Sequence, residues 1–186
     1  RFESCRDHNL TKMNQAKIWR YKKTYSFLSR HCKPAEKILD LGTSNDLSKY
    51  IKQKGFNVKN TSGENLDINF DSVLDPSIDV VTAFEIFEHM LAPFNILTKI
   101  KAPKLIASVP LRLWFADAYW NNHDDWDKHY HEFEIKQFNF LLNKSGWKLI
   151  DSEKWIPQSK FKIGLRPILR MFTPRYYIVY CERINS

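Results

Sequence analysis

Short apolar runs alternate with amphipathic stretches along this chain. Between residues 10 and 31, apolar and aromatic side chains recur at helical spacing among lysines, which predicts an amphipathic helix. Pro34 then precedes an apolar run over residues 37–41 that stops at Gly42 and predicts a buried strand. Residues 47–53 predict the next helix, because Gly55 just after them is a typical helix stop.

The same alternation continues to the end of the chain. It predicts helices over 87–101 and 134–145, and strands over 56–58, 66–68, 78–84, 104–109, 147–150 and 176–180. The basic, apolar stretch 160–172 is instead expected to be an irregular connection, because Gly164 and Pro167 interrupt any helix there. Strands alternating with helices predict an α/β fold with a mostly parallel sheet covered on both faces. Ligands of such sheets bind beyond the carboxyl ends of the strands, so a nucleotide-like ligand is expected near Gly42.

Length and composition favour one globular domain. The chain has 186 residues, of which 43% are hydrophobic and 15% aromatic. Its three cysteines are far apart and form no C-x-x-C pair, which argues against a disulfide framework or a zinc site and favours a reduced cytoplasm. No apolar run approaches the roughly 20 residues of a membrane span. No signal peptide is recognisable, although the chain begins with Arg1 rather than Met.

The formal net charge of +8 favours anionic partners, including nucleic acid. Many of the basic residues lie near the two ends: Lys12, Lys17, Arg20, Lys22, Lys23 and Arg30, then Lys160, Lys162, Arg166, Arg170, Arg175 and Arg183. The alternative is a solvated basic face, because a nucleic-acid site needs a clustered patch. No nucleic-acid-binding motif accompanies the charge.

Four segments carry a resemblance to a known family. They are Ile38-Leu-Asp-Leu-Gly42, Phe84-Glu-Ile-Phe-Glu-His-Met-Leu-Ala-Pro93, Ile106-Ala-Ser-Val-Pro110, and His129-Tyr-His-Glu-Phe133 running on to Ser145-Gly-Trp147. In order and spacing they resemble the class I S-adenosylmethionine-dependent methyltransferases over roughly residues 35–150. The resemblance implies a Rossmann-like, doubly wound, three-layer fold whose final strand is antiparallel. It also divides the single domain 1–186 into a helical cap (1–34), a cofactor-binding half (35–110) and a substrate-side half (111–186).

The resemblance implies S-adenosylmethionine as cofactor, bound first at the turn after residue 41. Gly42 lets the backbone approach the ligand closely, and the backbone of Thr43 and Ser44 can meet the carboxylate or hydroxyls of the ligand. Asp40 could accept a hydrogen bond from the ammonium group of the methionine part. The family usually has further glycines where Ser44 and Asp46 stand, so Asp46 is alternatively a simple helix cap.

Further cofactor contacts are expected from the next two strands. Ser62 stands where the family usually has an acid for the ribose hydroxyls, and Glu64 could replace that acid from the loop. Asp67 corresponds to the residue that meets the adenine amino group, with a turn residue as the alternative. Glu85 follows the strand beside which the transferable methyl would lie.

Two histidines are the catalytic candidates. His89 comes shortly after Glu85 and Glu88 and would share a helix face with Glu85 if a helix has begun there. An imidazole in that place can act as a base for a hydroxyl or amine substrate, whereas the alternative is a histidine that fixes the loop by hydrogen bonding. The resemblance adds His129 as the second candidate.

The segment from 111 to 131 is rich in aromatic and histidine residues. Long loops often carry binding sites, so we expect a substrate wall or lid formed by Trp114, Tyr119, Trp120, Trp126 and His131. The alternative is extra core. A metal site built from His123, Asp124, Asp125, Asp127 and His129 is the other interpretation of this segment, but nothing in the spacing fixes a ligand geometry, so no metal site is predicted.

The sequence therefore predicts methyl transfer from S-adenosylmethionine to a small or medium-sized acceptor. Methyl transfer needs chiefly in-line approach, so a catalytic base is not obligatory. The first alternative is a catalytically weak or inactive binding module with the same fold, and the second is a nucleic-acid-binding protein. Neither the acceptor nor the oligomeric state follows from the sequence.

Overall fold

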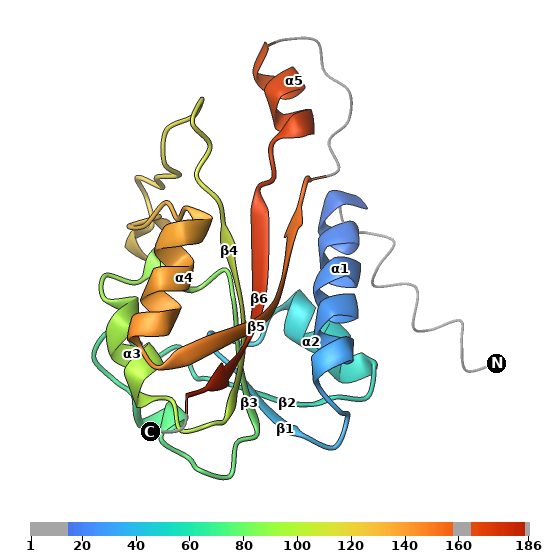
Figure 1. Cartoon of the computed structure of the whole chain (residues 1–186), viewed down its shortest axis with the longest axis vertical. Coiled ribbons are helices and arrows are strands. Elements are labelled where there is room, and N and C mark those ends of the chain that lie inside the picture. Colours follow the sequence, from blue (N-terminus) through green and yellow to red (C-terminus); the bar gives the residue numbers. More distant parts are fainter. Residues whose placement is uncertain (1–14, 158–164, 185–186) are drawn as a thin grey trace, which may run out of the picture.

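The computed structural model describes residues 15–157 and 165–184 of the chain. Its centre is a six-stranded sheet with the strand order β2-β1-β3-β4-β6-β5 (Figure 1). The pairs β2–β1, β1–β3 and β3–β4 are parallel, whereas β6 is antiparallel to both of its neighbours. The predicted α/β class, with a mostly parallel sheet and an antiparallel final strand, is confirmed.

The elements lie close to the predicted ones. The strands are β1 Lys37–Asp40, β2 Asn57–Asn60, β3 Val80–Phe84, β4 Lys104–Pro110, β5 Trp147–Trp155 and β6 Tyr176–Arg183. The α-helices are α1 Gln15–His31, α2 Asp46–Gln53, α3 Pro93–Lys99, α4 Ile135–Lys144 and α5 Leu165–Phe172. Three short 3-10 turns are Asp71–Val73, Phe87–His89 and Asp125–Asp127. The part of the first predicted helix before Gln15 lies outside the described residues.

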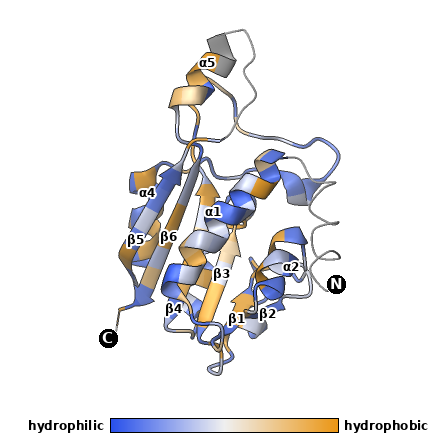
Figure 2. Cartoon of the chain, turned by 90° about the vertical axis from the view of Figure 1, so that its right-hand side faces the viewer, coloured by the Kyte–Doolittle hydropathy of each residue, from blue (hydrophilic) through white to orange (hydrophobic). Residues whose placement is uncertain are grey.

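Alternating strand residues face two different layers of helices, as the pleat of a strand requires. On β1, Ile38 packs in the core beneath α1 and α2, whereas Leu39 packs in the core beneath α3 and α4. Val80 and Val81 of β3 divide in the same way. Figure 1 shows the two helix pairs on opposite sides of the sheet, and Figure 2 shows the apolar central strands behind α1. The three-layer arrangement is thus confirmed.

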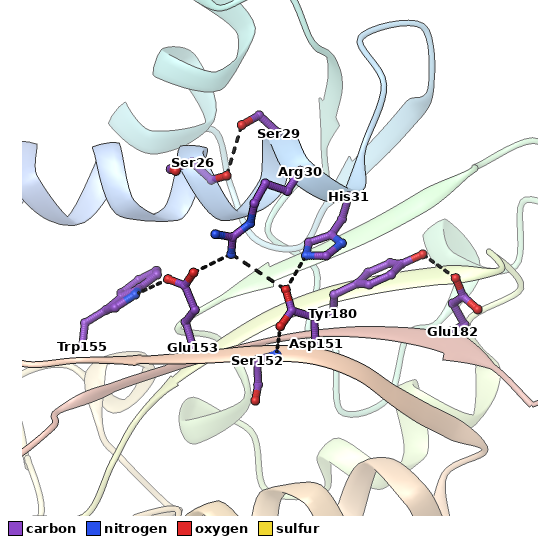
Figure 3. A network of polar contacts seen from close by, with 10 residues as sticks. All are labelled: Ser26, Ser29, Arg30, His31, Asp151, Ser152, Glu153, Trp155, Tyr180 and Glu182. Atoms are coloured by element: carbon purple, nitrogen blue, oxygen red, sulfur yellow. Dashed lines mark hydrogen bonds and ion pairs between the residues drawn. The ribbon is translucent and has the colours of Figure 1, made fainter.

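Helix α1 is tied to the antiparallel end of the sheet by polar contacts (Figure 3). Arg30 approaches Glu153 at 2.5 Å and Asp151 at 3.8 Å, both on β5. His31 contacts the same Asp151 at 2.8 Å and stacks on the ring of Tyr180 from β6, with the centroids 4.4 Å apart. These contacts hold α1 across the sheet and direct its N-terminal half toward the carboxyl ends of the parallel strands.

Two predicted elements in the central part of the chain are wrong. Residues 66–68 form turns rather than a strand, because Asn65 accepts from the backbone N–H groups of Ile68 and Asn69. The predicted helix 87–101 is broken into the turn Phe87–His89 and α3, since Pro93 begins a new helix at its N-terminus, where no N–H is needed.

The predicted irregular connection 160–172 contains a helix. Its first part, 160–164, lies outside the described residues, but α5 begins at Leu165 and continues to Phe172. Pro167 falls in the first turn of α5, where backbone N–H groups have no partner within the helix, so a proline there does not interrupt it. In Figure 1, α5 stands away from the sheet, beyond the ends of β5 and β6.

Both cysteines in the described part of the chain, Cys32 and Cys181, are free and buried. Burial raises the pKa of each thiol to about 12, so both are protonated at neutral pH. None of the helices that the structure describes is long and apolar enough to cross a membrane.

Candidate functional site

The turn after β1 lies at the carboxyl edge of the parallel strands and begins with a constrained glycine. Gly42 has φ of +95°, and a Cβ added to it would approach the Ile86 side chain to 3.1 Å. Its N–H donates to the Thr61 hydroxyl at 2.7 Å, which links the turn to the end of β2. Thr43 lies next to the following loop, because a Cβ on Gly63 would approach its methyl group to 3.1 Å. The turn is therefore packed against the Ile86 side chain and the residues after β2, at the edge where the ligand is expected.

Asp40 is buried at the end of β1 and bonded within the protein. Its side chain accepts from the Thr82 hydroxyl at 2.6 Å and from the Asn60 amide at 2.9 Å. Burial raises the pKa of Asp40 to about 6 even though both hydrogen bonds act in the opposite direction. Its predicted contact with the methionine ammonium stays a prediction, and any such contact would compete with these two donors.

The start of α2 is capped by the protein itself. The Asn45 side chain accepts from the N–H groups of Leu47 and Ser48, and the Ser48 side chain accepts from the N–H of Asn45 in return. The cap is therefore Asn45 rather than Asp46. Asp46 instead pairs with Lys17 of α1 at 2.8 Å. Ser44 is exposed in the same turn, as are Thr43, Asn45 and Asp46.

The loop after β2 holds the ribose candidates. The Ser62 N–H and hydroxyl donate to the Glu64 carboxylate at 2.7 and 3.0 Å. Partial burial acts to raise the pKa of Glu64, but these and other hydrogen bonds lower it below its ordinary value. Glu64 is therefore ionised at neutral pH and able to accept from ligand hydroxyls.

Asp67 has a structural partner. Its carboxylate accepts from the N–H groups of Leu91 and Ala92, at 3.0 and 2.8 Å. Those groups belong to the two residues just before α3, and the N-cap residue Ala92 has no side chain able to cap the helix. Asp67 thus fixes the chain that leads into α3, in a turn of residues 66–68, and its contact with the adenine amino group stays a prediction.

Glu85 begins the segment after β3 in an unusual backbone conformation. Its φ is +57°, which side-chain-bearing residues rarely adopt, and its carboxylate pairs with Arg20 of α1 at 2.5 Å. Because Glu85 is outside any helix, the prediction that it shares a helix face with His89 is wrong. Arg20 also lies over the Tyr176 ring of β6, 5.5 Å from its centroid, so α1 covers this edge of the sheet.

His89 and His129 lie together, although 40 positions separate them in the sequence. Their rings meet edge to face with centroids 4.9 Å apart. His89 Nδ1 is 3.0 Å from the Lys128 carbonyl oxygen, and His129 Nδ1 is 3.1 Å from the Glu132 carboxylate. Both partners are acceptors, so each Nδ1 carries the proton and each Nε2 is left with a lone pair in the neutral ring. Burial and the neighbouring His129 lower the pKa of His89.

Glu88 lies beside this histidine pair and is 1% exposed. Its Oε1 is 3.9 Å from His89 Nε2, and its Oε2 has no hydrogen-bond partner. Burial, reinforced by the charge of Glu85, raises the pKa of Glu88 well above its ordinary value.

The aromatic loop forms a surface rather than extra core. Trp114, Trp120 and Trp126 are more than half exposed. Tyr119 and Trp120 line a cavity of about 300 Å³ together with Arg170 and Arg175. Tyr119 also contacts His129, with ring centroids 5.2 Å apart, so the cavity opens next to the histidine pair. The side chains of Trp114, Trp126 and His131 do not line it; His131 stacks on Phe133 instead.

The structure therefore brings together most predicted residues along one edge, in two groups. Gly42, Thr43, Ser44, Ser62 and Glu64 lie around the first turn, whereas Glu85, His89, His129, Tyr119 and Trp120 lie near the aromatic loop. Sequence reasoning missed Arg20, Thr61 and the role of Glu88. No local signal marks Arg20 or Thr61, because their partners are 65 and 19 positions away.

Comparison with known proteins supports the fold. No protein-family model and no curated protein sequence matches the chain. Among solved structures, 1,6-didemethyltoxoflavin-N1-methyltransferase from Burkholderia thailandensis, with bound S-adenosylhomocysteine, aligns at a TM-score of 0.62 and 14% identity over 90% of this chain and 81% of its own. An S-adenosylmethionine-dependent methyltransferase from Archaeoglobus fulgidus aligns at 0.52 and 15% over 88% and 94%. The (4+2)-cyclase SpnF aligns at 0.56 and 10% over 89% and 82%. The chain thus has the class I S-adenosylmethionine-dependent methyltransferase fold, as its motifs predict.

Proposed function

We propose that this chain, which has the fold of the class I S-adenosylmethionine-dependent methyltransferases, transfers a methyl group from S-adenosylmethionine to a small or medium-sized acceptor. The observation that carries the proposal is the Gly42 turn, in which a side chain at residue 42 would fill the space toward Ile86. The turn lies at the carboxyl end of β1, which is where ligands of doubly wound sheets bind. The likeness to an enzyme with bound S-adenosylhomocysteine supports the identity of the ligand.

The cofactor would be held by the first group of residues. Gly42, Thr43 and Ser44 would present backbone groups to the methionine part, and Glu64, aligned by Ser62, would accept from the ribose hydroxyls. Asp40, Asp46 and Asp67 stay predicted contacts, since each carboxylate is engaged within the protein. S-Adenosylmethionine, when bound, supplies an electrophilic methyl carbon.

The acceptor would bind on the side of the aromatic loop. The cavity beside Tyr119 and Trp120 is large enough for a small ring system, and its lining carries two arginines, Arg170 and Arg175, and two acidic residues, Asp117 and Glu132. His89 Nε2 has a lone pair available at neutral pH, so His89, with His129 beside it, would take a proton from an acceptor hydroxyl or amine. Glu85, paired with Arg20, would orient polar groups of the ligands between the cofactor region at Gly42 and the acceptor region at the aromatic loop.

Calorimetric titration with S-adenosylhomocysteine tests the proposal. We expect saturable binding of one ligand per chain, weakened at least about tenfold by Gly42→Ala, because the new Cβ would approach Ile86 and strain a positive φ. Gly55→Ala is the matched control, since Gly55 has almost the same φ of +94° but nothing within 4 Å of its Cβ position. No binding at millimolar ligand, or equal weakening by both substitutions, would contradict the proposal.

A binding module without transfer activity is the second candidate. It is favoured by the Asn45 cap, which occupies N–H groups at the start of α2 that a ligand could otherwise use. The cyclase SpnF also has this fold, so the fold itself does not require methyl transfer. Normal S-adenosylhomocysteine binding combined with no methyl transfer to a panel of hydroxyl, amine and carbon acceptors would select this candidate.

A further inference from the structure

Glu88, His89 and His129 form a compact group of metal-ligating side chains. Each offers one ligand atom, and the three atoms lie within 4.8 Å of one another. Glu88 and His89 belong to the 3-10 turn after β3, whereas His129 comes from the aromatic loop before α4. The loop is held against the turn by its backbone, since the N–H groups of Tyr130 and His131 donate to the Glu88 carbonyl oxygen. The fold, rather than neighbouring positions in the chain, therefore creates the group.

Both histidines are oriented as metal ligands are. The Lys128 carbonyl oxygen and the Glu132 carboxylate each accept from an Nδ1, which leaves both Nε2 lone pairs unused. Ligating histidines in proteins almost always donate their other ring N–H to a carbonyl or carboxylate in this way, which fixes the tautomer and the ring direction.

Glu88 supplies the independent observation. Its side chain is 1% exposed, and Oε2 has no partner among the described residues. A buried carboxylate without a partner is costly, and a bound cation is a common way to satisfy it. The charges around the group are mixed: Glu85 and Glu132 act on Glu88 against Arg20, and Asp127 and Glu85 act on His89 against His129.

We propose that Glu88, His89 and His129 bind one divalent transition-metal ion, with Zn²⁺ as its representative. Two imidazole nitrogens and one carboxylate oxygen suit Zn²⁺, Fe²⁺ or Co²⁺ and are too rich in nitrogen for Mg²⁺ or Ca²⁺. Bonds of about 2.1 Å in a tetrahedral site place ligand atoms about 3.4 Å apart, so modest side-chain rotations suffice to close the group. Three protein ligands leave a coordination position open, as catalytic rather than structural sites do.

This site differs from the cluster of acidic and histidine residues at positions 123–129. It shares His129 with that cluster, but the acidic members have other partners. Asp124 caps the turn at Trp126, Asp125 pairs with Lys128, and Asp127 accepts from Tyr119 and Asn121. Ion binding is separate from methyl transfer, because it does not depend on the cofactor. With the ion bound, His89 and His129 are ligands rather than bases.

Equilibrium dialysis of the untagged full chain against Zn²⁺, with the metal quantified by mass spectrometry, tests the proposal. We expect one Zn²⁺ per chain in the wild type, and at least about a tenfold weaker affinity in Glu88→Gln and in His129→Ala. His123→Ala is the matched control, because His123 is an exposed histidine of the same loop outside the group, and it should bind Zn²⁺ as the wild type does. Circular dichroism of each variant confirms that it folds.

Co²⁺ substitution provides a readout that needs no variant. We expect Co²⁺ to give visible absorption bands of a site with nitrogen and oxygen ligands, and Zn²⁺ to abolish them by displacement. Absence of bound Zn²⁺ in the wild type at 100 µM free metal, on the order of a weak protein site, would overturn the proposal. Equal Zn²⁺ affinity in the wild type, Glu88→Gln and His129→Ala would also overturn it, because the ion would then be bound elsewhere. Neither outcome depends on whether S-adenosylhomocysteine binds.

Discussion

At the end of β1, the Asp40 carboxylate is enclosed between the Thr82 hydroxyl and the Asn60 amide. These two bonds join β1 to β3 on one side and to β2 on the other, so a single side chain holds three neighbouring strand ends in register. Burial destabilises the ionised carboxylate by more than the two neutral hydrogen-bond donors stabilise it, so the pKa of Asp40 rises. A residue that the family resemblance assigns to the cofactor is thus also part of the frame that shapes the site.

Asp40 predicts a pH dependence of stability. Its pKa is about 6 in the folded protein against an ordinary value of 3.8, so the folded state binds more protons between these values and stability falls as the pH rises. We expect Asp40→Asn to gain up to about 3 kcal/mol of unfolding free energy relative to the wild type between pH 4 and pH 7. Urea unfolding at both pH values measures this. If the difference in unfolding free energy between Asp40→Asn and the wild type is the same at both pH values, the raised pKa of Asp40 is contradicted.

Substitution of Asp67 is expected to lower the unfolding free energy rather than the affinity for the ligand. Asp67→Ala removes the acceptor for two N–H groups just before α3 and should cost about 1 kcal/mol. Asp67→Asn keeps one acceptor oxygen and should cost less. The affinity for S-adenosylhomocysteine should stay within about twofold in both variants, because fixing the chain that leads into α3 is the role that the geometry supports. A large loss of affinity with unchanged stability would instead support the adenine contact.

Among the elements, β6 contributes one arginine that joins two helices to the sheet. The Arg183 guanidinium donates to four carbonyl oxygens, those of Leu97, Thr98, Ile100 and Ser145. These oxygens lie at the C-terminal ends of α3 and α4, where carbonyl groups lack partners within the helix and a positive charge is favourable. The same guanidinium lies 4.8 Å above the Trp147 ring of β5. Four elements therefore depend on one side chain.

Arg183→Lys should be clearly destabilising. An ammonium group cannot reproduce the planar fork that reaches four acceptors, so we expect a loss of about 2 kcal/mol in unfolding free energy. Arg112→Lys is the control, since Arg112 is mostly exposed and makes one ion pair at 3.4 Å with Glu134; it should change stability by less than about 0.5 kcal/mol. Denaturant unfolding of both variants measures the difference. Equal small effects would show that the helix ends are satisfied without Arg183.

At the scale of the whole molecule, a mostly parallel sheet covered on both faces was predictable from the apolar periodicity, whereas the antiparallel final strand was predicted from the family resemblance. Ile38 and Leu39 illustrate this, since adjacent apolar residues on a strand indicate burial on both faces. Residues 66–68 were not predictable in the same way: Leu66 and Ile68 have strand-like alternation, but Ile68 is exposed, and the turn bonds to Asn65 prevail over the pattern.

Parts of the candidate site were predictable from the sequence where a single residue type is required by the local backbone conformation. Gly42 is such a case, because its positive φ follows from the turn itself. The Glu88, His89 and His129 group was not, because local spacing cannot show that a loop 40 positions away returns to the turn after β3. The Arg20–Glu85 pair was hidden for the same reason.

The net charge of +8 predicts different salt responses for different ligands. S-Adenosylhomocysteine releases few counterions on binding, so its affinity should change by less than about twofold between 50 and 200 mM salt. Binding of a nucleic acid through the basic residues should instead fall by more than about tenfold over that range. Titrations of both ligands at the two salt concentrations compare the methyltransferase hypothesis with the nucleic-acid alternative. Tight, salt-sensitive RNA or DNA binding without S-adenosylhomocysteine binding would favour the alternative.

A crystal structure of the chain grown with S-adenosylhomocysteine tests the central claim most directly. The proposal predicts electron density for the ligand over the Gly42 turn, with its ribose hydroxyls near Glu64 and its sulfur directed toward Glu85 and His89. Density for the ligand at another place, or an empty turn at saturating ligand, would contradict it.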